Sequence, residues 1–273
     1  MLITSRDNSL LRQARAVRDG KVDKLIFIEG LRLSEEALHS NLSLEAVIFS
    51  EEIAKKPKAA RVINSLSKIC ARLVSVSEKL LESISFTKTP QGIIVLAQRP
   101  DTSEARLAHN IHDLPLVVIV HQLNNPVNVG AILRTAEAAG ATGVIATKNT
   151  TDPFSPKALR GAMGSAFRLP IWNGASYREA IEFCHNKGIL SVCAAATARL
   201  AYTEINWARA CALILGPEST GLAVSEINAA SEAVRIPMQG SVESLNVSVA
   251  AGILLYEAVR QRQAAEHQRR AEA

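Results

Sequence analysis

The sequence predicts an α/β protein of two domains, a small α/β domain followed by a larger one built on a parallel sheet. Short apolar runs alternate with helical patterns along the whole chain, which is typical of α/β folds. The clearest run of the second half, Leu116–Val120, is apolar at every position, as in a parallel strand covered on both faces. A polar stretch at 99–113, which contains Pro100, separates the two halves.

The first domain, expected over residues 1–98, begins with a helix. Leu10, Leu11 and Ala14 recur at helical spacing within residues 8–19, which predicts this helix. A turn signal at 89–92 precedes the last apolar run of the domain. The remaining elements expected are a strand at 24–28, a helix at 31–39, a strand at 46–49, a helix at 58–68, a strand at 71–76, a helix at 77–83 and a strand at 93–97.

The second domain, expected over residues 114–262 after a linker at 99–113, continues the alternation. Its first strand leads into a helix at 129–139, which Gly140 terminates. The basic tail at 263–273 is expected to fray. The domain is expected to hold strands at 116–120, 143–147, 189–195, 212–215 and 233–237, and further helices at 156–162, 176–187 and 245–262.

Basic residues are concentrated in the first domain. Residues 1–100 hold 16 Lys and Arg against 11 Asp and Glu, whereas residues 101–259 hold 11 against 13. This distribution indicates a polyanionic partner, such as RNA, for the first domain. Arg12, Arg15 and Arg18 share one face of the first helix, where a merely solvated surface is the alternative interpretation.

The composition and the absence of certain motifs exclude several classes of protein. With 48% apolar and 21% charged residues, the chain is expected to be soluble and globular. Its four cysteines form no CxxC pair, so we expect buried thiols and no metal site. No signal-peptide pattern and no run of 18 or more apolar residues are present, which predicts a cytoplasmic protein without a membrane partner. The motifs GxGxxG, GxxxxGK[ST], GxSxG and HExxH are absent.

The loop after the first strand of the second domain, 121–130, is rich in Asn, Pro and Gly. Within it, Asn128 is interpreted as a helix N-cap, and Arg134 lies in the helix that follows. His121 is expected to have a structural or supporting role. The alternative is that Asn128 is only a cap and Arg134 only a surface residue.

Two further loops, 215–222 and 235–248, also follow buried strands and are rich in Gly, Pro, Asn and Ser. Glu218 stands where one strand ends, and Ser244 and Asn246 begin the last helix. Ligands of open α/β sheets bind at the carboxyl ends of the strands, so the three loops together could line one pocket. A solvated carboxylate and simple helix caps are the alternative interpretations.

At these loops the sequence resembles the SpoU/TrmH branch of the SPOUT RNA methyltransferases. The resemblance lies in Asn125–Ala136, Leu215–Leu222 and Ile236–Ala250, with a further match at Pro156–Pro170. It spans residues 115–258, with the motifs in the family's order and spacing. Residues 3–97 resemble the substrate-binding domain fused to many members, a domain akin to kink-turn-binding ribosomal proteins.

The resemblance implies a methyltransferase domain with a trefoil knot, which is exceptional among folds. It also implies S-adenosylmethionine as the cofactor, a homodimer packed through the knot, and chemistry that needs no metal. The cofactor would be held mainly by backbone groups. The positions that match this role are Thr197, Leu215, Gly216, Gly221, Ile236, Met238 and Leu245.

The resemblance further implies methyl transfer to a ribose 2′-hydroxyl, with Arg134 at the position of the family's catalytic arginine. A base is one role for it; because a guanidinium is effectively always protonated, a phosphate clamp that stabilises the developing alkoxide is an equally good one. Asn128, Glu218, Ser244 and Asn246 would position the ribose and Arg134. The residues expected to contact RNA are Arg6, Arg12, Arg15, Arg18, Arg160 and Arg168.

The sequence therefore predicts S-adenosylmethionine-dependent methylation of a ribose 2′-hydroxyl in RNA. The expected substrate is 23S ribosomal RNA, because the fused N-terminal domain accompanies many members that act on ribosomal RNA. Transfer RNA is the nearest alternative substrate. Two rival functions are those of a non-catalytic RNA-binding or ribosome-assembly protein and of a methyltransferase that acts on a base or a protein.

Overall fold

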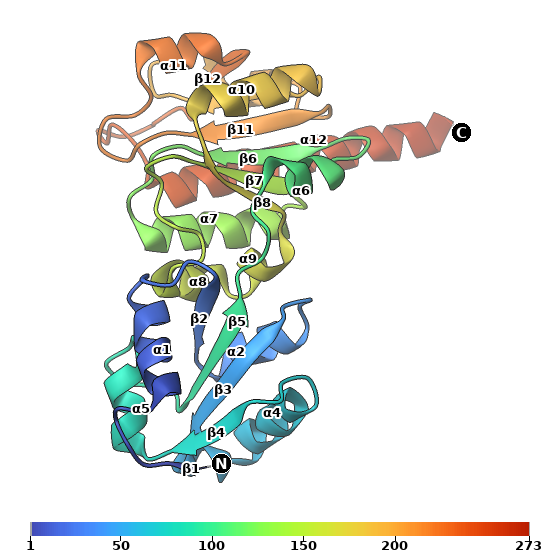
Figure 1. Cartoon of the computed structure of the whole chain (residues 1–273). Coiled ribbons are helices and arrows are strands. Elements are labelled where there is room, and N and C mark those ends of the chain that lie inside the picture. Colours follow the sequence, from blue (N-terminus) through green and yellow to red (C-terminus); the bar gives the residue numbers. More distant parts are fainter. Residues whose placement is uncertain (1, 273) are drawn as a thin grey trace. The chain divides into compact units, whose positions relative to one another are not determined.

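The computed structural model describes residues 2–272, which form two compact units (Figure 1). Unit 1 holds the chain up to Pro100 together with Phe154–Arg168. Unit 2 holds Asp101–Pro153 and the chain from Leu169 onward. The segment 154–168 thus groups with the N-terminal residues, although it lies far from them in sequence.

Unit 1 is built on a five-stranded mixed sheet with the order β1-β4-β3-β5-β2. Strands β1, β4 and β3 are parallel, and β5 runs antiparallel to both β3 and β2. Helices α1 and α5 bury their apolar faces on one side of this sheet. The strands are β1 (Leu2–Ile3), β2 (Leu25–Glu29), β3 (Leu44–Ser50), β4 (Leu73–Val76) and β5 (Ile93–Gln98); the helices are α1 (Ser9–Arg18), α2 (Leu31–Leu38), α3 (Glu51–Ala54), α4 (Pro57–Ser67), α5 (Glu78–Ile84), α8 (Pro156–Ala162) and α9 (Ser165–Arg168).

Unit 2 is built on a seven-stranded sheet with the order β10-β12-β9-β11-β6-β7-β8, and all its strand pairs are parallel. The central strands β6 and β11 are buried at every position, which confirms the interpretation of their apolar runs. The strands are β6 (Leu116–Val120), β7 (Gly143–Thr147), β8 (Ile171–Ala175), β9 (Leu190–Ala194), β10 (Leu200–Ala201), β11 (Cys211–Leu215) and β12 (Glu232–Arg235).

Helices cover both faces of this sheet. Apolar side chains of α6, α10 and α11 pack with Val117, Ile119 and Ile214 on one face, while α7 and α12 pack against each other and lie on the other (Figure 1). The helices are α6 (Glu104–His109), α7 (Pro126–Ala138), α10 (Tyr177–Asn186), α11 (Val224–Ala229) and α12 (Val247–Glu272), with a 3₁₀ turn, η1 (Tyr202–Glu204).

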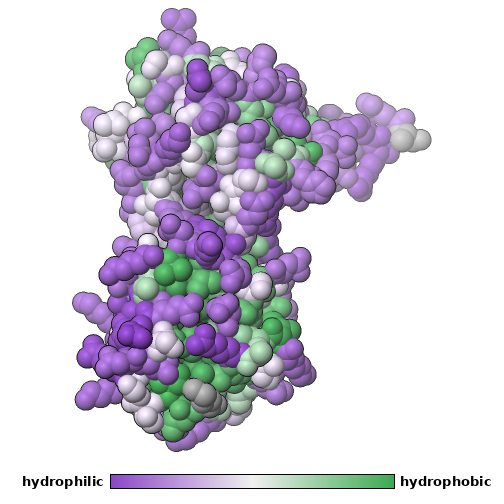
Figure 2. Space-filling model, viewed as in Figure 1, coloured by the Kyte–Doolittle hydropathy of each residue, from purple (hydrophilic) through white to green (hydrophobic). Residues whose placement is uncertain are grey.

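The end of the chain differs from the expected frayed tail. Helix α12 does not stop at 262 but continues to Glu272, and its last turns extend past the sheet with a hydrophilic surface (Figures 1 and 2). Arg262 and Gln261 bond to the rest of unit 2 and anchor the helix at its midpoint. An anchored helix made largely of Ala, Gln, Glu and Arg continues readily, because these residues have high helix propensity.

Three more elements also correct the expectations. The helix expected at 129–139 begins at Pro126, because Asn125 rather than Asn128 is the N-cap and accepts the Val127 N–H at 2.9 Å. The expected linker contains helix α6. Strand β8 was missed because Asn173 and Gly174 interrupt its apolar run.

Candidate active site

Four neighbouring parallel strands, β12, β9, β11 and β6, bring their carboxyl ends to one edge of the unit 2 sheet. The loops that leave this edge begin with Ile236 after β12, Ala195 after β9, Gly216 after β11 and His121 after β6. The three motif loops recognised in the sequence therefore start side by side. This is the edge at which open α/β sheets bind ligands.

Backbone donors are available along this edge. Among the described residues, no backbone carbonyl accepts the N–H groups of Thr197, Gly216, Ile236, Met238 and Leu245. All five residues are at least partly accessible to solvent. Because backbone N–H groups need a partner, these donors are available to water or to a ligand that is bound mainly through the main chain.

The loop after β11 folds tightly at its first residue. A Cβ atom on Gly216 would lie 2.6 Å from Cγ of Leu222 and 3.1 Å from its backbone nitrogen. Only glycine allows Leu222, which is buried, to fold back so closely. Gly221 has a φ of +66°, a left-handed conformation that glycine adopts without strain. Leu215 itself is buried at the strand end.

Three of the predicted catalytic residues are joined in one hydrogen-bonded chain. Asn128 is buried in the first turn of α7, and its Nδ2 donates to Oε1 of Glu218 in the loop after β11. Asn246 donates from Nδ2 to Oδ1 of Asn128 at 3.3 Å. Asn128 thus connects the three motif loops, a role that its predicted function as an N-cap did not include. Ser244 is exposed and forms no hydrogen bond with Asn128, Glu218 or Asn246.

Asn246 also begins the last helix. Its Oδ1 accepts from the N–H of Ser248 at 2.9 Å and from the hydroxyl of Ser248 at 2.6 Å. The alternative interpretation, that polar residues cap this helix, describes Asn246 but not Ser244, which lies outside the helix.

Arg134 is exposed on α7, whereas its neighbours Ile132, Leu133 and Ala136 are buried. Its guanidinium forms no hydrogen bond or ion pair within residues 2–272. A guanidinium on a packed helix with all five N–H donors available is suited to a phosphate or an oxyanion.

His121, the first residue after β6, is buried at the same edge of the sheet. Its side chain is buried between Thr147 and Glu226, with Nδ1 2.9 Å from Thr147 Oγ1 and Nε2 2.9 Å from Glu226 Oε1. The ring also packs edge-on against Tyr177, with centroids 4.8 Å apart. The expectation of a structural or supporting role fits these contacts.

The comparisons with known proteins decide the family. A family model described as the SpoU rRNA methylase family matches residues 115–256, which is more than half of the chain. The chain belongs to the SpoU rRNA methylase family. A second model, the MRM3-like substrate-binding domain, matches residues 10–95 of this SpoU methylase. Both parts of the resemblance seen in the sequence are thereby confirmed.

Relatives of this SpoU methylase match it over most of its length. An uncharacterized tRNA/rRNA methyltransferase of Synechocystis is 31% identical over 96% of this chain and 95% of its own. The 23S rRNA (guanosine-2′-O-)-methyltransferase RlmB of a Burkholderia species is 35% identical over 70% of this chain and 78% of its own. The AdoMet-bound rRNA methyltransferase structure from Sinorhizobium meliloti has a TM-score of 0.83 and 28% identity, covering 95% of this chain and 97% of that one. The predicted enzyme class, an S-adenosylmethionine-dependent RNA ribose methyltransferase, is confirmed.

Two contacts at the site were not predicted from the sequence. Arg235, at the end of β12, donates from Nη1 to the carbonyl of Ala198 at 2.8 Å and also to that of Arg199. It thereby holds the turn that contains Thr197. Glu226, the partner of His121, lies in helix α11, which was not predicted. Glu226 accepts the N–H of Ala223, but Ala223 has no side-chain acceptor to complete a capping box, so the sequence carried no specific signal for this helix.

The arginines expected to contact RNA differ in their surroundings. In unit 1, Arg12 and Arg160 are exposed. Arg15 donates from Nη2 to the carbonyl of Arg6 at 2.7 Å. Arg18 bonds Asp19 at 2.8 Å and the Ser85 carbonyl at 3.2 Å, so much of its donor capacity is used within the unit. The hydrogen bond from Arg18 lowers the pKa of the Asp19 carboxyl.

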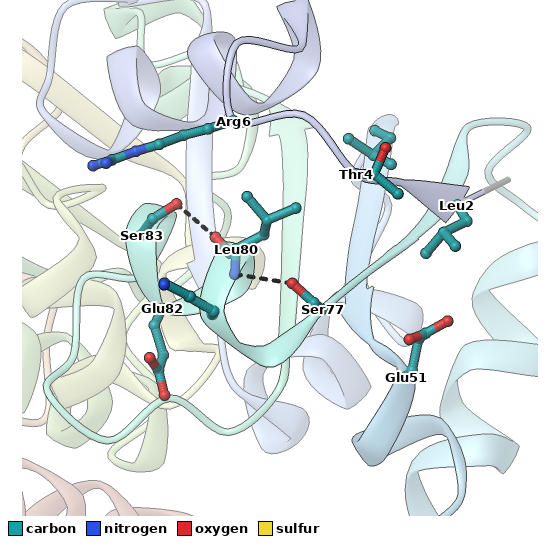
Figure 3. A pocket seen from close by; sticks show the side chains of 10 residues that line it. Leu2, Thr4, Arg6, Glu51, Ser77, Leu80, Glu82 and Ser83 are labelled. Carbon is teal, nitrogen blue, oxygen red and sulfur yellow. Dashed lines mark hydrogen bonds between the residues drawn. The ribbon is translucent and has the colours of Figure 1, made fainter.

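Arg168 pairs with Glu36 at 2.6 Å, within unit 1. Arg6 lines a cavity of about 710 Å³ beside β1 and α5 (Figure 3). Lys79, Glu51 and Glu82 line the same cavity, so its cations are balanced by carboxylates. This cavity lies in the other unit from the strand-end loops and is not part of the candidate active site.

The cysteines are free and buried, as the sequence predicted. Within residues 2–272, no group of three or more His, Cys, Asp or Glu side chains is placed to hold a metal ion. No helix in the same range is both long enough and apolar enough to span a membrane.

Proposed function

We propose that this protein transfers a methyl group from S-adenosylmethionine to a ribose 2′-hydroxyl of 23S ribosomal RNA. The observation that carries the proposal is the Asn128–Glu218–Asn246 chain, which joins three loops at the ligand-binding edge of a SpoU-family sheet. The named relatives of the RlmB type act on guanosine 2′-hydroxyls of 23S rRNA, and the MRM3-like domain supplies a basic substrate-binding unit. Such a substrate would place the protein in the cytoplasm.

The strand edge fits the cofactor. The accessible N–H groups of Thr197, Gly216, Ile236, Met238 and Leu245 can hold a ligand through the main chain. When bound, S-adenosylmethionine supplies an electrophilic methyl group on a sulfonium, a chemistry that requires no metal. Leu215 and Gly221 would border the same site, because they begin and end the tight loop after β11.

The hydrogen-bonded residues Asn128, Glu218 and Asn246 would position the ribose hydroxyl. Glu218 accepts from Asn128 with Oε1, which fixes the carboxylate while its second oxygen remains free to accept a ribose hydroxyl. Alignment of the attacking oxygen with the methyl group can account for much of the rate of a transfer reaction. We place Ser244, which is exposed beside Asn246, among the residues that contact the ribose or its phosphate.

Arg134 then stabilises charge. As the hydroxyl loses its proton, negative charge develops on the ribose oxygen, and a guanidinium can clamp that oxygen together with the neighbouring phosphate. We favour this role over that of a base, because a guanidinium is effectively always protonated. Arg134→Lys is expected to retain part of the activity, since lysine keeps the charge but not the bidentate geometry.

The placement of Arg134 on α7 favours action across a homodimer. It lies six positions after Asn128, which puts the two side chains roughly 120° apart around the helix. Asn128 is buried, whereas Arg134 is exposed on the face of α7 that also carries the exposed Val127. Val249 and Tyr256 of α12, which packs on α7, are also exposed. We propose that this α7–α12 surface forms the dimer, with the knot beneath it, and that Arg134 serves the partner's site.

Complementation tests this arrangement. Co-expression of Arg134→Ala and Glu218→Ala chains gives half heterodimers, each with one complete site if Arg134 acts across the interface. Roughly a quarter of the wild-type activity is then expected from two inactive parents. If Arg134 acts within its own chain, no activity returns, and the trans arrangement is wrong.

The reaction itself is tested by transfer of tritiated methyl groups from S-adenosylmethionine to total RNA from a strain that lacks the gene. The expected result is labelled 23S RNA that yields 2′-O-methylribose, and no label with Arg134→Ala. Label in tRNA would keep the chemistry and replace the substrate. Label in a base would contradict the ribose as acceptor, and absence of both label and cofactor binding would favour a non-catalytic RNA-binding or assembly protein.

The division into an RNA-binding part at 1–98, a linker at 99–113 and a methyltransferase part at 114–262 with the tail 263–273 stays a prediction. So do the RNA contacts of Arg6, Arg12, Arg15, Arg18, Arg160 and Arg168. Of these, the exposed Arg12 and Arg160 are the best placed to bind phosphate.

A further inference from the structure

His121 attaches to both ends of the loop that carries Glu218. Its backbone N–H donates to the carbonyl of Leu215, where β11 ends, at 2.9 Å. Its ring lies 2.9 Å from Glu226 in the first turn of α11, the helix that follows the loop. The segment 216–223 therefore lies between two residues that His121 contacts, Leu215 before it and Glu226 after it.

The chemistry of the ring fixes the direction of these bonds. An ionised carboxylate can only accept, so Nε2 of His121 is the donor to Glu226. When the imidazole is neutral, Nδ1 is then the acceptor of a hydrogen bond from the hydroxyl of Thr147. The side chain is only 4% exposed, so loss of either bond would leave a buried polar nitrogen without a partner.

Glu226 passes this restraint to the loop. While Oε1 bonds the His121 ring, Oε2 accepts the N–H of Ala223 at 2.8 Å, the residue at which the loop ends and α11 begins. The backbone carbonyl of Glu226 accepts the hydroxyl of Tyr177 at 2.8 Å. Both the side chain and the main chain of Glu226 are thus fixed to the body of unit 2.

We infer that His121 and Glu226 are positioning residues that hold the loop 216–223 in the conformation needed for cofactor binding and for catalysis by Glu218. Neither residue needs to touch the cofactor or the RNA. A loop with glycines at 216 and 221 has many alternative conformations, so an external restraint on both its ends reduces the entropy lost on binding. The inference rests on the proposed function, because it assigns the loop to the S-adenosylmethionine site.

Two substitutions of nearly equal size separate the contacts. The amide nitrogen of Gln can occupy the position of Nε2, so His121→Gln keeps the bond to Glu226 and gives up that to Thr147. Asn reaches only the position of Nδ1, so His121→Asn keeps the Thr147 contact and loses Glu226. His185→Asn, on the exposed face of α10, is the matched control.

The first readout is the Kd of S-adenosylmethionine, measured by calorimetry on the full chain without RNA. We expect His121→Asn and Glu226→Ala to weaken binding about 10-fold each, the loss of one charged hydrogen bond, and their double variant to weaken it no further. His121→Gln is expected to stay within about threefold of the wild type, as the retained bond requires.

The second readout is hydrogen exchange of the amides in 216–223, which is expected to quicken in His121→Asn but not in His121→Gln or His185→Asn. Equal Kd values and equal exchange for His121→Asn and His121→Gln would overturn the inference, as would uniform faster exchange throughout unit 2, which would indicate a general loss of stability. A wild-type chain that binds no S-adenosylmethionine would instead overturn the proposed function, while the exchange result would still test the restraint on the loop.

Discussion

Replacement of Arg262 tests how the last helix is attached to unit 2. The guanidinium donates from Nε to the carbonyl of Trp207 at 3.1 Å and from Nη1 to that of Leu114 at 2.9 Å. Its Nη2 donates to the carbonyls of Pro115 at 2.9 Å and of Arg209 at 2.8 Å. Residues that precede β6 and β11 are in this way tied to one side chain of α12. Nη2 also lies 3.5 Å from Sγ of Cys211, and Arg262→Ala removes all of these bonds at once.

The expected loss follows from the two partly buried bonds to carbonyl groups, those to Trp207 and Pro115. The third partly buried contact, with Sγ of Cys211, adds little because sulfur is a weak acceptor. Each hydrogen bond to a charged group contributes about 1.5 kcal/mol at the lower end of its range, which gives roughly 3 kcal/mol for the pair. Water can replace the guanidinium at the Leu114 and Arg209 carbonyls, because those bonds are exposed. A loss of roughly 3 kcal/mol corresponds to a fall in Tm of about 6–12 °C for a domain of this size.

Urea unfolding followed by circular dichroism, with the transition of unit 2 analysed separately, measures this loss. Arg262→Lys is expected to recover no more than about a third of it, since a lysine ammonium cannot reach four carbonyls with the geometry of the guanidinium fork. Arg269→Ala, on the exposed end of the same helix, is the control and should change stability by less than about 0.5 kcal/mol. A loss below about 1 kcal/mol for Arg262→Ala would refute the reasoning.

Three further outcomes are expected. Burial raises the pKa of Cys184 to about 12 and that of Cys193 to about 11. The stability that these protonated thiols contribute is complete below their unfolded pKa of about 8.5 and is lost as pH rises through the folded values. The free energy of unfolding measured in urea should therefore decline above about pH 9. Glu29→Ala removes the acceptor of the Phe86 N–H at 2.7 Å and should destabilise unit 1 by about 2–3 kcal/mol in the same assay, whereas equal stability would contradict a bracing role. Glu218→Ala should reduce methyl transfer about 100-fold with Tm unchanged within about 2 °C; a parallel fall in Tm would mean that Glu218 acts through the fold.

Much of the fold could be predicted because the signals were local. The strand Leu116–Val120 is buried at all five positions and was predicted with the same bounds, since a short continuous apolar run is typical of a strand covered on both faces. Strand β10 and helix α11 were missed, because two residues and six residues carry too little periodicity to detect. The end of α12 was misjudged because the anchor of that helix, Arg262, depends on carbonyls that lie 53 to 148 residues away in sequence.

For the site too, the residues in local motifs could be predicted, whereas their contacts could not. Asn128, Glu218 and Asn246 were selected from their motifs, and the structure joins them. Their joining could not be read from the sequence, because it depends on the order of strands β6 and β11 in the sheet. His121 and Glu226 show the limit most clearly. They stand 105 residues apart, and no local pattern links a histidine at a strand end with a glutamate in a short helix.

The loop 216–223 is held by side chains from outside it, and its own composition explains why. A segment that must expose backbone N–H groups to a ligand cannot use those groups for its own stability. Its two glycines lower its stiffness further. Order must then be supplied by side chains that are themselves buried and satisfied, and His121 has this property, with both ring nitrogens bonded and its backbone N–H on Leu215. We therefore expect variants at this histidine to alter cofactor affinity before they alter global stability, an order of effects that calorimetry and urea unfolding on one set of variants can establish.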